Sequence, residues 1–133
     1  MNDFLALLGR IALATLFIWS GAMKISGFSH TAASIASKGL AMPALLTALT
    51  IFIELGLGLA LVIGWRTRLV GVVIALWLIP TTLLFHAFWS ASGAAVMPQQ
   101  VNFFKNLSIF GGMLMVAAFG PGAYSVDRSS GRS

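Results

Sequence analysis

The chain has 133 residues, of which 59% are hydrophobic and 8% are charged, and its mean hydropathy is +0.96. A soluble domain carries about 25% charged residues, so this composition excludes an ordinary water-exposed surface and predicts an integral membrane protein. The net charge of +5 does not indicate nucleic-acid binding, because the basic residues are scattered at the ends of apolar runs. The absence of cysteine excludes disulfides, iron–sulfur clusters and thiolate metal sites in this chain.

Four apolar runs are long enough to cross a membrane. They predict an all-α fold, an antiparallel four-helix transmembrane bundle that forms a single domain over 1–133. The expected membrane helices span, in chain order, about 4–22, 43–64, 69–89 and 101–119. The first run is interpreted as a retained helix rather than a signal peptide, because Asp3 is the only charge before Arg10 and Arg10 lies inside the apolar run.

The connections between these runs have their own signals. After the first helix, residues 29–39 are less apolar and predict a short interfacial or re-entrant helix. The second helix begins at Pro43, a residue type favoured in a first helical turn. Pro80 lies inside the third helix and predicts a kink there, because proline removes a backbone hydrogen bond.

The basic residues of the short connections predict the topology. Arg66, Arg68, Arg128 and Arg132 would lie on one side of the membrane, and Lys24 and Lys38 on the other. Because the side that is richer in Lys and Arg is usually cytoplasmic, both termini are expected in the cytoplasm.

Every expected helix carries polar residues that are costly in lipid. They are Arg10, Glu54, His86 and Lys105, the last with Asn102 and Asn106 beside it. A charged group near the bilayer centre costs at least ~2.5–3.5 kcal/mol. Such residues therefore face the interior and pair with one another, or they carry the function.

The predicted depths place these residues in two layers. The inner layer is Arg10 with Glu54, which are expected to pair so that both stay charged. Three interpretations remain open for this pair: a salt bridge that fixes helix register, a role in binding or proton movement, and independent snorkelling of the two side chains.

The outer layer combines His86 with Asn102, Lys105 and Asn106, and would suit an anionic or carbonyl-bearing head group. In the alternative, Lys105 snorkels to the head groups and His86 completes a hydrogen-bond network. Aromatic residues that could wall a quinone slot are Trp77, Phe85, Trp89 and Phe103. Neither haem nor a metal site is expected, because His86 is the only histidine inside a predicted span and the other potential ligands lie at different depths.

Several short motifs together resemble the DoxX family of small four-helix membrane proteins. They are Gly9-Arg10, Ser20-Gly21-x-x-Lys24, Glu54-Leu-Gly-x-Gly58, Gly64-Trp-Arg-Thr-Arg68, Phe85-His86, Asn102-Phe-Phe-Lys105-Asn106-Leu and Gly120-Pro-Gly-Ala-Tyr-Ser-Val-Asp127. The resemblance is greatest to the bacterial inner-membrane branch to which an oxidoreductase activity is ascribed. The family's recurrent polar positions would correspond here to Arg10, Glu54, Arg68, His86, Lys105 and Asn106.

The resemblance implies a bacterial inner-membrane protein and a membrane subunit of a redox system, with quinone as the candidate cofactor. The family takes its name from a membrane subunit linked to a thiosulfate:quinone oxidoreductase, and other members are associated with oxidative-stress complexes. The residues proposed for quinone binding are His86, Lys105 and Trp89. Two alternatives remain: a non-catalytic scaffold or anchor, and a small transporter or lipid-binding protein. The expected partners are membrane lipids and either another protein or a second copy of the chain.

Overall fold

A computed structural model describes residues 1–131 of the chain, and all regular structure in that range is helical. Arg132, one of the residues used for the topology prediction, lies outside the described residues. In chain order the elements are α1 (Asn2–Ser26), α2 (Phe28–Ser37), α3 (Pro43–Phe52), the π-helical turn η1 (Ile53–Leu57), α4 (Gly58–Ile63), α5 (Thr67–Phe85), the 3₁₀ turns η2 (Phe88–Ser90) and η3 (Gly93–Ala95), α6 (Val96–Phe119) and α7 (Val126–Ser129). Four helical stretches in the described range are long and apolar enough to cross a membrane, which confirms the predicted fold class.

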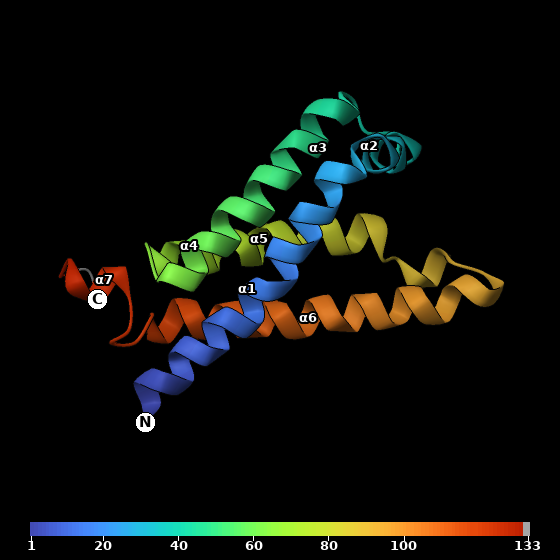
Figure 1. Cartoon of the computed structure of the whole chain (residues 1–133). Helices are drawn as coiled ribbons and strands as arrows, with labels where there is room; N and C mark the ends of the chain where they lie inside the picture. The colour runs from blue at the N-terminus through green and yellow to red at the C-terminus, as the bar shows by residue number, and fades with distance from the viewer. Residues whose placement is uncertain (132–133) are drawn as a thin grey trace. The chain divides into compact units, whose positions relative to one another are not determined.

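The chain divides into two compact units. The first unit contains Met1–Arg66 and the C-terminal segment from Pro121 onward, and the second contains Thr67–Gly120. Each unit is built around a pair of long helices (Figure 1).

In the first unit, α1 packs antiparallel against the continuous stretch formed by α3, η1 and α4 (Figure 1). Glycines make the close approach possible. A Cβ atom added at Gly21 would lie 2.8 Å from Leu55 Cγ, and one added at Gly58 would lie 2.9 Å from Ile18 Cγ1. Small residues let helix backbones approach in membranes, so these two glycines fix which turns of the two helices face each other.

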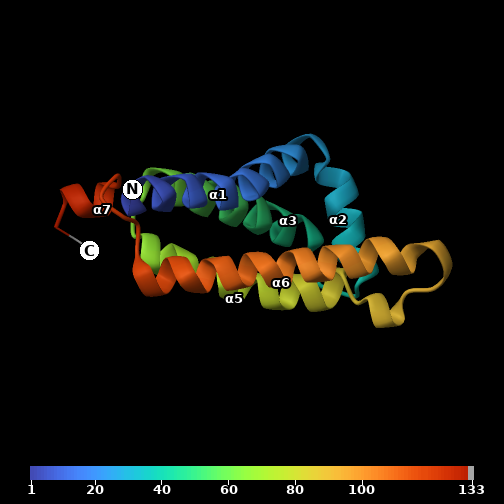
Figure 2. The same cartoon turned by 90° about the horizontal axis from the view of Figure 1, so that it is seen from below.

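The helix α1 extends to Ser26, beyond the end expected at residue 22. Lys24 is therefore part of the membrane helix rather than of the following loop. The chain then turns at Gly27 into α2, which crosses from the end of α1 toward the start of α3 (Figure 2). The buried Ile35 anchors this short helix, whose existence the sequence predicted.

In the second unit, α5 packs along α6. The two helices approach closely at Gly71, where an added Cβ atom would lie 3.0 Å from the backbone oxygen of Met113. Pro80 lies inside α5, and the helix continues through it. The Thr81 hydroxyl donates to the Trp77 carbonyl oxygen at 2.9 Å, which gives this turn an additional hydrogen bond.

Candidate functional site

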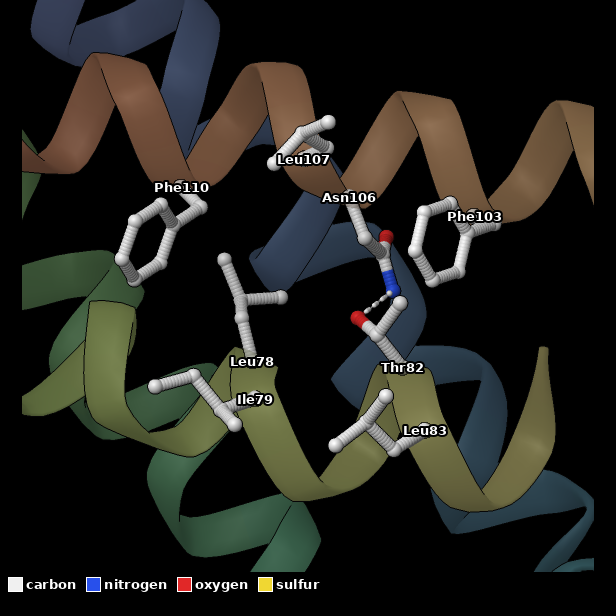
Figure 3. A pocket seen from close by; sticks show the side chains of 8 residues that line it. All are labelled: Leu78, Ile79, Thr82, Leu83, Phe103, Asn106, Leu107 and Phe110. Carbon is white, nitrogen blue, oxygen red and sulfur yellow. Dashed lines mark hydrogen bonds between the residues drawn. The ribbon is translucent and has the colours of Figure 1, made fainter. Parts of the chain in front are cut away.

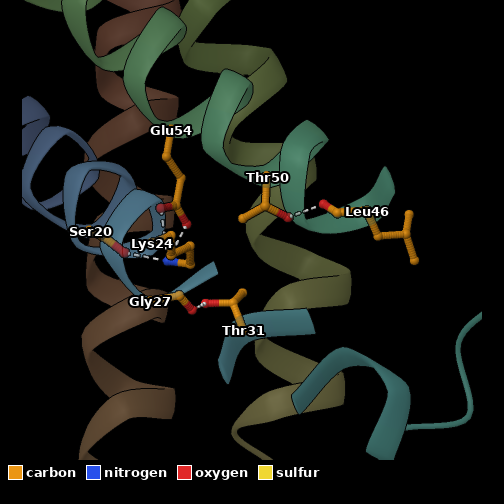
Figure 4. Close-up of polar contacts among 7 residues, drawn as sticks. All are labelled: Ser20, Lys24, Gly27, Thr31, Leu46, Thr50 and Glu54. Carbon is orange, nitrogen blue, oxygen red and sulfur yellow. Dashed lines mark hydrogen bonds and ion pairs between the residues drawn. The ribbon is translucent and has the colours of Figure 1, made fainter. Parts of the chain in front are cut away.

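The central polar contact of the first unit joins α1 to the π-helical turn η1. Lys24 Nζ donates to both carboxylate oxygens of Glu54, at 2.9 and 3.1 Å, and to the hydroxyl oxygen of Ser20 (Figure 4). Glu54 is 8% exposed, so its charge is held in largely apolar surroundings and is compensated by Lys24. The expectation that Glu54 pairs with Arg10 is wrong.

Helix register explains why Lys24 and not Arg10 reaches Glu54. A Cβ atom at Gly21 would lie 3.2 Å from Glu54 Cβ, so Glu54 faces the part of α1 that lies one turn before Lys24. Ser20 and Lys24 are four residues apart and therefore share a face of α1. Glu54 itself lies in η1, and single π-turns inside membrane-length helices are frequent at functional sites.

Arg10 has different hydrogen-bond partners, at the other end of the same helix pair. Its side chain is 1% exposed and donates to the carbonyl oxygens of Leu61 and Val62 in the last turn of α4, and to that of Tyr124 in the C-terminal segment. The last carbonyl groups of a helix lack intrahelical partners and carry partial negative charge. Arg10 thus provides hydrogen bonds to the carbonyl groups at the end of α4 and links the C-terminal segment to that helix end.

Asp127 completes this polar cluster at the end of α4. Its carboxylate accepts a hydrogen bond from the backbone N–H of Arg66 at 2.7 Å, and its own N–H donates to the Gly64 carbonyl oxygen at 2.9 Å. Asp3 binds the same segment, because its carboxylate accepts from the Ala123 N–H at 2.8 Å. Asp127 belongs to the motif on which the family resemblance rests, but the sequence alone did not identify it as a site residue.

In the second unit, Asn106 and Thr82 meet in the interface between α5 and α6. Asn106 Nδ2 donates to Thr82 Oγ1 at 3.0 Å, and Asn106 is 6% exposed. This pair borders a groove of about 170 Å³ whose remaining lining is apolar (Figure 3). The lining residues are Leu78, Ile79, Thr82, Leu83, Phe103, Asn106, Leu107 and Phe110.

The other outer-layer residues do not join this pair. His86 lies beyond the end of α5, and its Nδ1 is 3.0 Å from Gln99 Oε1. Lys105 is exposed and donates to the Asn102 side-chain oxygen at 2.9 Å. The predicted outer layer is therefore three separate polar pairs rather than one network.

Two further predicted residues have structural contacts. Trp89 lies in the turn η2 and makes an edge contact with Phe103, with ring centroids 5.6 Å apart, so it supports one wall of the groove without lining it. Arg68 donates to the carbonyl oxygens of Ala117 and Ala118 near the end of α6. Arg68 thus caps α6 in the way that Arg10 caps α4.

The residues that the sequence reasoning did not select are Ser20, Lys24, Thr82, Gln99 and Asp127. The four-residue spacing of Ser20 and Lys24 was visible, but ending the first helix at residue 22 placed Lys24 in a loop. Within residues 1–131, no cluster of three or more His, Asp and Glu side chains could hold a metal ion.

Four apolar helices whose buried faces carry paired charges and amides define a multi-pass integral membrane protein. The chain belongs to the DoxX family, because the DoxX family model matches residues 5–87. It is 38% identical to the inner membrane protein YphA of Escherichia coli over 124 residues, which cover 93% of this chain and 89% of that protein. It is 37% identical to the inner membrane protein YqjF of Escherichia coli over 128 residues, covering 96% and 93%.

A more distant likeness extends to eukaryotes. The Surfeit locus protein 4 homolog of Drosophila melanogaster is 28% identical over 128 residues, which cover 95% of this chain and 41% of that protein. No solved structure matches the chain. The family membership, the two inner-membrane relatives and the four apolar helices together identify a multi-pass inner-membrane protein.

Proposed function

We propose that the protein is the membrane subunit of a redox system and that it binds the ring of an isoprenoid quinone in the groove between α5 and α6. The observation that carries this proposal is the Asn106–Thr82 pair at the wall of an otherwise apolar groove. Ligand sites of this kind combine apolar walls with a few oriented polar groups.

The polar pair has hydrogen-bonding capacity to spare. An amide has two N–H donors and an acceptor oxygen, and Asn106 uses one N–H for Thr82. The other N–H suits a quinone carbonyl, and the amide oxygen suits a quinol hydroxyl. Phe103 and Phe110 line the groove with aromatic rings, which stack favourably on a quinone ring.

This assignment differs from the set selected on the sequence. Asn106 replaces His86 and Lys105 as the group that contacts the ring, because neither of those two side chains lines the groove. The chain contributes binding and orientation. Electrons would come from a partner subunit that carries a flavin or metal centre, since the chain contains no cysteine and no clustered metal ligands in its described part.

The test is a titration of the purified protein in nanodiscs with a short-chain ubiquinone. Binding is measured by the quenching of tryptophan fluorescence. Asn106→Leu and Thr82→Val are expected to weaken binding about ten-fold each, the value of one hydrogen bond of ~1.4 kcal/mol. The matched control is Ser108→Ala, which alters an exposed hydroxyl of α6 that donates to the Phe104 carbonyl oxygen. Quenching that does not saturate, or that is equal in Asn106→Leu and wild type, contradicts the proposal.

A non-catalytic scaffold is the second candidate, and the exposure of α6 favours it. Only 11% of the apolar window of Gly93–Phe119 is buried, the smallest share of the four candidate spans. A photo-crosslinking residue at Leu114, which is exposed on α6, would then capture one defined protein or a second copy of the chain. Crosslinking to lipid alone from that position contradicts the scaffold hypothesis.

A further inference from the structure

A second cavity, a wide open recess in the surface, lies in the first unit, where α1 turns into α2. Its volume is about 500 Å³, and it is bordered only by the last turns of α1 and the start of α2. Five of its eight lining residues have polar or charged side chains, whereas Thr82 and Asn106 are the polar residues that line the groove of the second unit, but most of the surface that faces the recess is apolar. The lining residues are Trp19, Ser20, Met23, Lys24, Ser26, Gly27, His30 and Thr31.

Lys24 connects this cavity to the buried carboxylate of Glu54. Lys24 lines the cavity and a quarter of its side chain is exposed, whereas Glu54 is not part of the lining. An ammonium group has three N–H donors. Those of Lys24 are engaged by Ser20 and by the two oxygens of Glu54 (Figure 4). A ligand in the cavity therefore competes with an existing ion pair.

The charge of the ligand determines whether this competition is favourable. An anion that draws Lys24 away leaves the Glu54 carboxylate without its partner in apolar surroundings, which is strongly unfavourable. A cation that takes over Glu54 leaves the Lys24 ammonium uncompensated in the same way. A ligand that carries both signs leaves neither side chain uncompensated, because its ammonium can replace that of Lys24 at the carboxylate when Lys24 turns toward its anionic group.

The remaining lining supports an ammonium that has N–H donors. Ser26 and Thr31 donate their hydroxyl protons to the backbone oxygens of Met23 and Gly27, so their oxygens are available as acceptors. Trp19 and Met23 add exposed apolar surface beside these polar atoms. A largely apolar recess that carries one ammonium group and several hydroxyl oxygens suits a charged head group attached to an aliphatic body.

We propose that the cavity at the α1–α2 turn binds a zwitterionic group that combines a primary ammonium with a phosphate or carboxylate. Two sources have this chemistry: the head group of an aminophospholipid and a free zwitterionic solute. The site lies entirely in the first unit, so it is independent of the quinone proposal for the second.

The experiment is native mass spectrometry of the protein released from nanodiscs that contain equal amounts of phosphatidylethanolamine, phosphatidylcholine and phosphatidylglycerol. Retention of phosphatidylethanolamine is expected to exceed that of the other two about ten-fold. Phosphatidylcholine has no N–H donor, and phosphatidylglycerol has no cation. Equal retention of the three lipids, or preference for phosphatidylglycerol, overturns the proposal.

Two variants locate the binding. The double substitution Lys24→Met with Glu54→Gln is expected to abolish the preference. Ser26→Trp, at an exposed position that borders the cavity, is expected to do the same by filling it and leaves the ion pair in place. The control is Arg128→Met, which removes one exposed positive charge from α7. Wild-type preference in both the double variant and Ser26→Trp overturns the proposal.

A competition arm separates the two sources. Soluble phosphoethanolamine at millimolar concentration displaces the bound lipid if the site accepts a free zwitterion. If the lipid stays bound while the preference for phosphatidylethanolamine holds, the site is specific for the membrane-anchored head group. Either result supports the shared chemistry of the ligand, and the lipid comparison decides whether that chemistry is recognised at all.

Discussion

Lys24 and Glu54, thirty positions apart in the sequence, form an ion pair in which the ammonium contacts both carboxylate oxygens. The pair links the end of α1 to a π-helical turn in the opposing stretch of helix. It leaves Arg10 free to satisfy the carbonyl groups at the end of α4. The two cationic side chains of α1 thus have separate partners, and their substitution should have separable effects.

A double-mutant cycle should detect this pairing. We expect Lys24→Met and Glu54→Gln each to destabilise the protein by about 2–3 kcal/mol, less than the ~3–5 kcal/mol typical of a fully buried pair, because Lys24 is partly exposed. The double variant should recover part of this loss, since neither charge is then left alone. Thermal unfolding in detergent measures the coupling. The corresponding cycle for Arg10 and Glu54 should be additive, and coupling there would contradict the observed register.

Arg10→Met should loosen the C-terminal segment. The substitution leaves the buried carbonyl oxygen of Leu61 without this donor, at a cost of about 1–3 kcal/mol, and removes the hydrogen bond that holds the Tyr124 carbonyl oxygen. Arg10→Lys should rescue only partly, because an ammonium lacks the planar fork that reaches several acceptors. Limited trypsin digestion is the measurement: cleavage after Arg66 and Arg128 should become faster in Arg10→Met. Unchanged cleavage would show that the segment is held by other contacts.

The glycines of η1 and α4 offer a matched steric test. Gly58→Leu should destabilise by about 1–3 kcal/mol, because its first side-chain carbon already approaches Ile18. Gly56→Leu, two residues earlier, should be close to neutral, since nothing lies within 4 Å of an added Cβ there. Thermal unfolding of both variants tests the helix pairing of the first unit. Equal effects at the two positions would argue against it.

The distribution of basic residues predicts that both termini are cytoplasmic, and single cysteines can test this. The natural sequence contains no cysteine, so each introduced thiol is unique. Ser37→Cys and Ser130→Cys are both at exposed positions. A membrane-impermeant maleimide applied to intact cells or spheroplasts should label position 37 and spare position 130. Labelling of position 130 alone would contradict the predicted topology and place both termini on the opposite side of the membrane.

The fold class followed directly from the sequence, because hydrophobic length is a local property. Each apolar run is long enough to span a bilayer, and every backbone polar group there must be satisfied within a helix. Pro43 marked the start of α3, as predicted. The predicted helix ends were wrong at two polar turns: α1 extends to Ser26 instead of residue 22, and α5 ends at Phe85 instead of residue 89, so that His86 and Trp89 lie beyond it.

The candidate sites needed tertiary structure because partner choice depends on helix register. Composition identified Arg10, Glu54 and Asn106 as polar groups that must be satisfied inside the membrane. It could not determine that Arg10 caps a helix end or that Thr82 is the partner of Asn106. Several residues of each helix could form a hydrogen bond or an ion pair with these groups. Depths in the membrane that are estimated only to within one helical turn do not distinguish between these partners.

Length, hydropathy and motif order are properties of the chain alone, and they were enough to identify a multi-pass helical membrane protein of the DoxX family. The pairing of Glu54 with Lys24, in contrast, became evident only from the packing of the folded helices. The physical reason lies in the packing at Gly21 and Gly58, where the lack of side chains lets two helices approach at one register and so brings that carboxylate within reach of that ammonium.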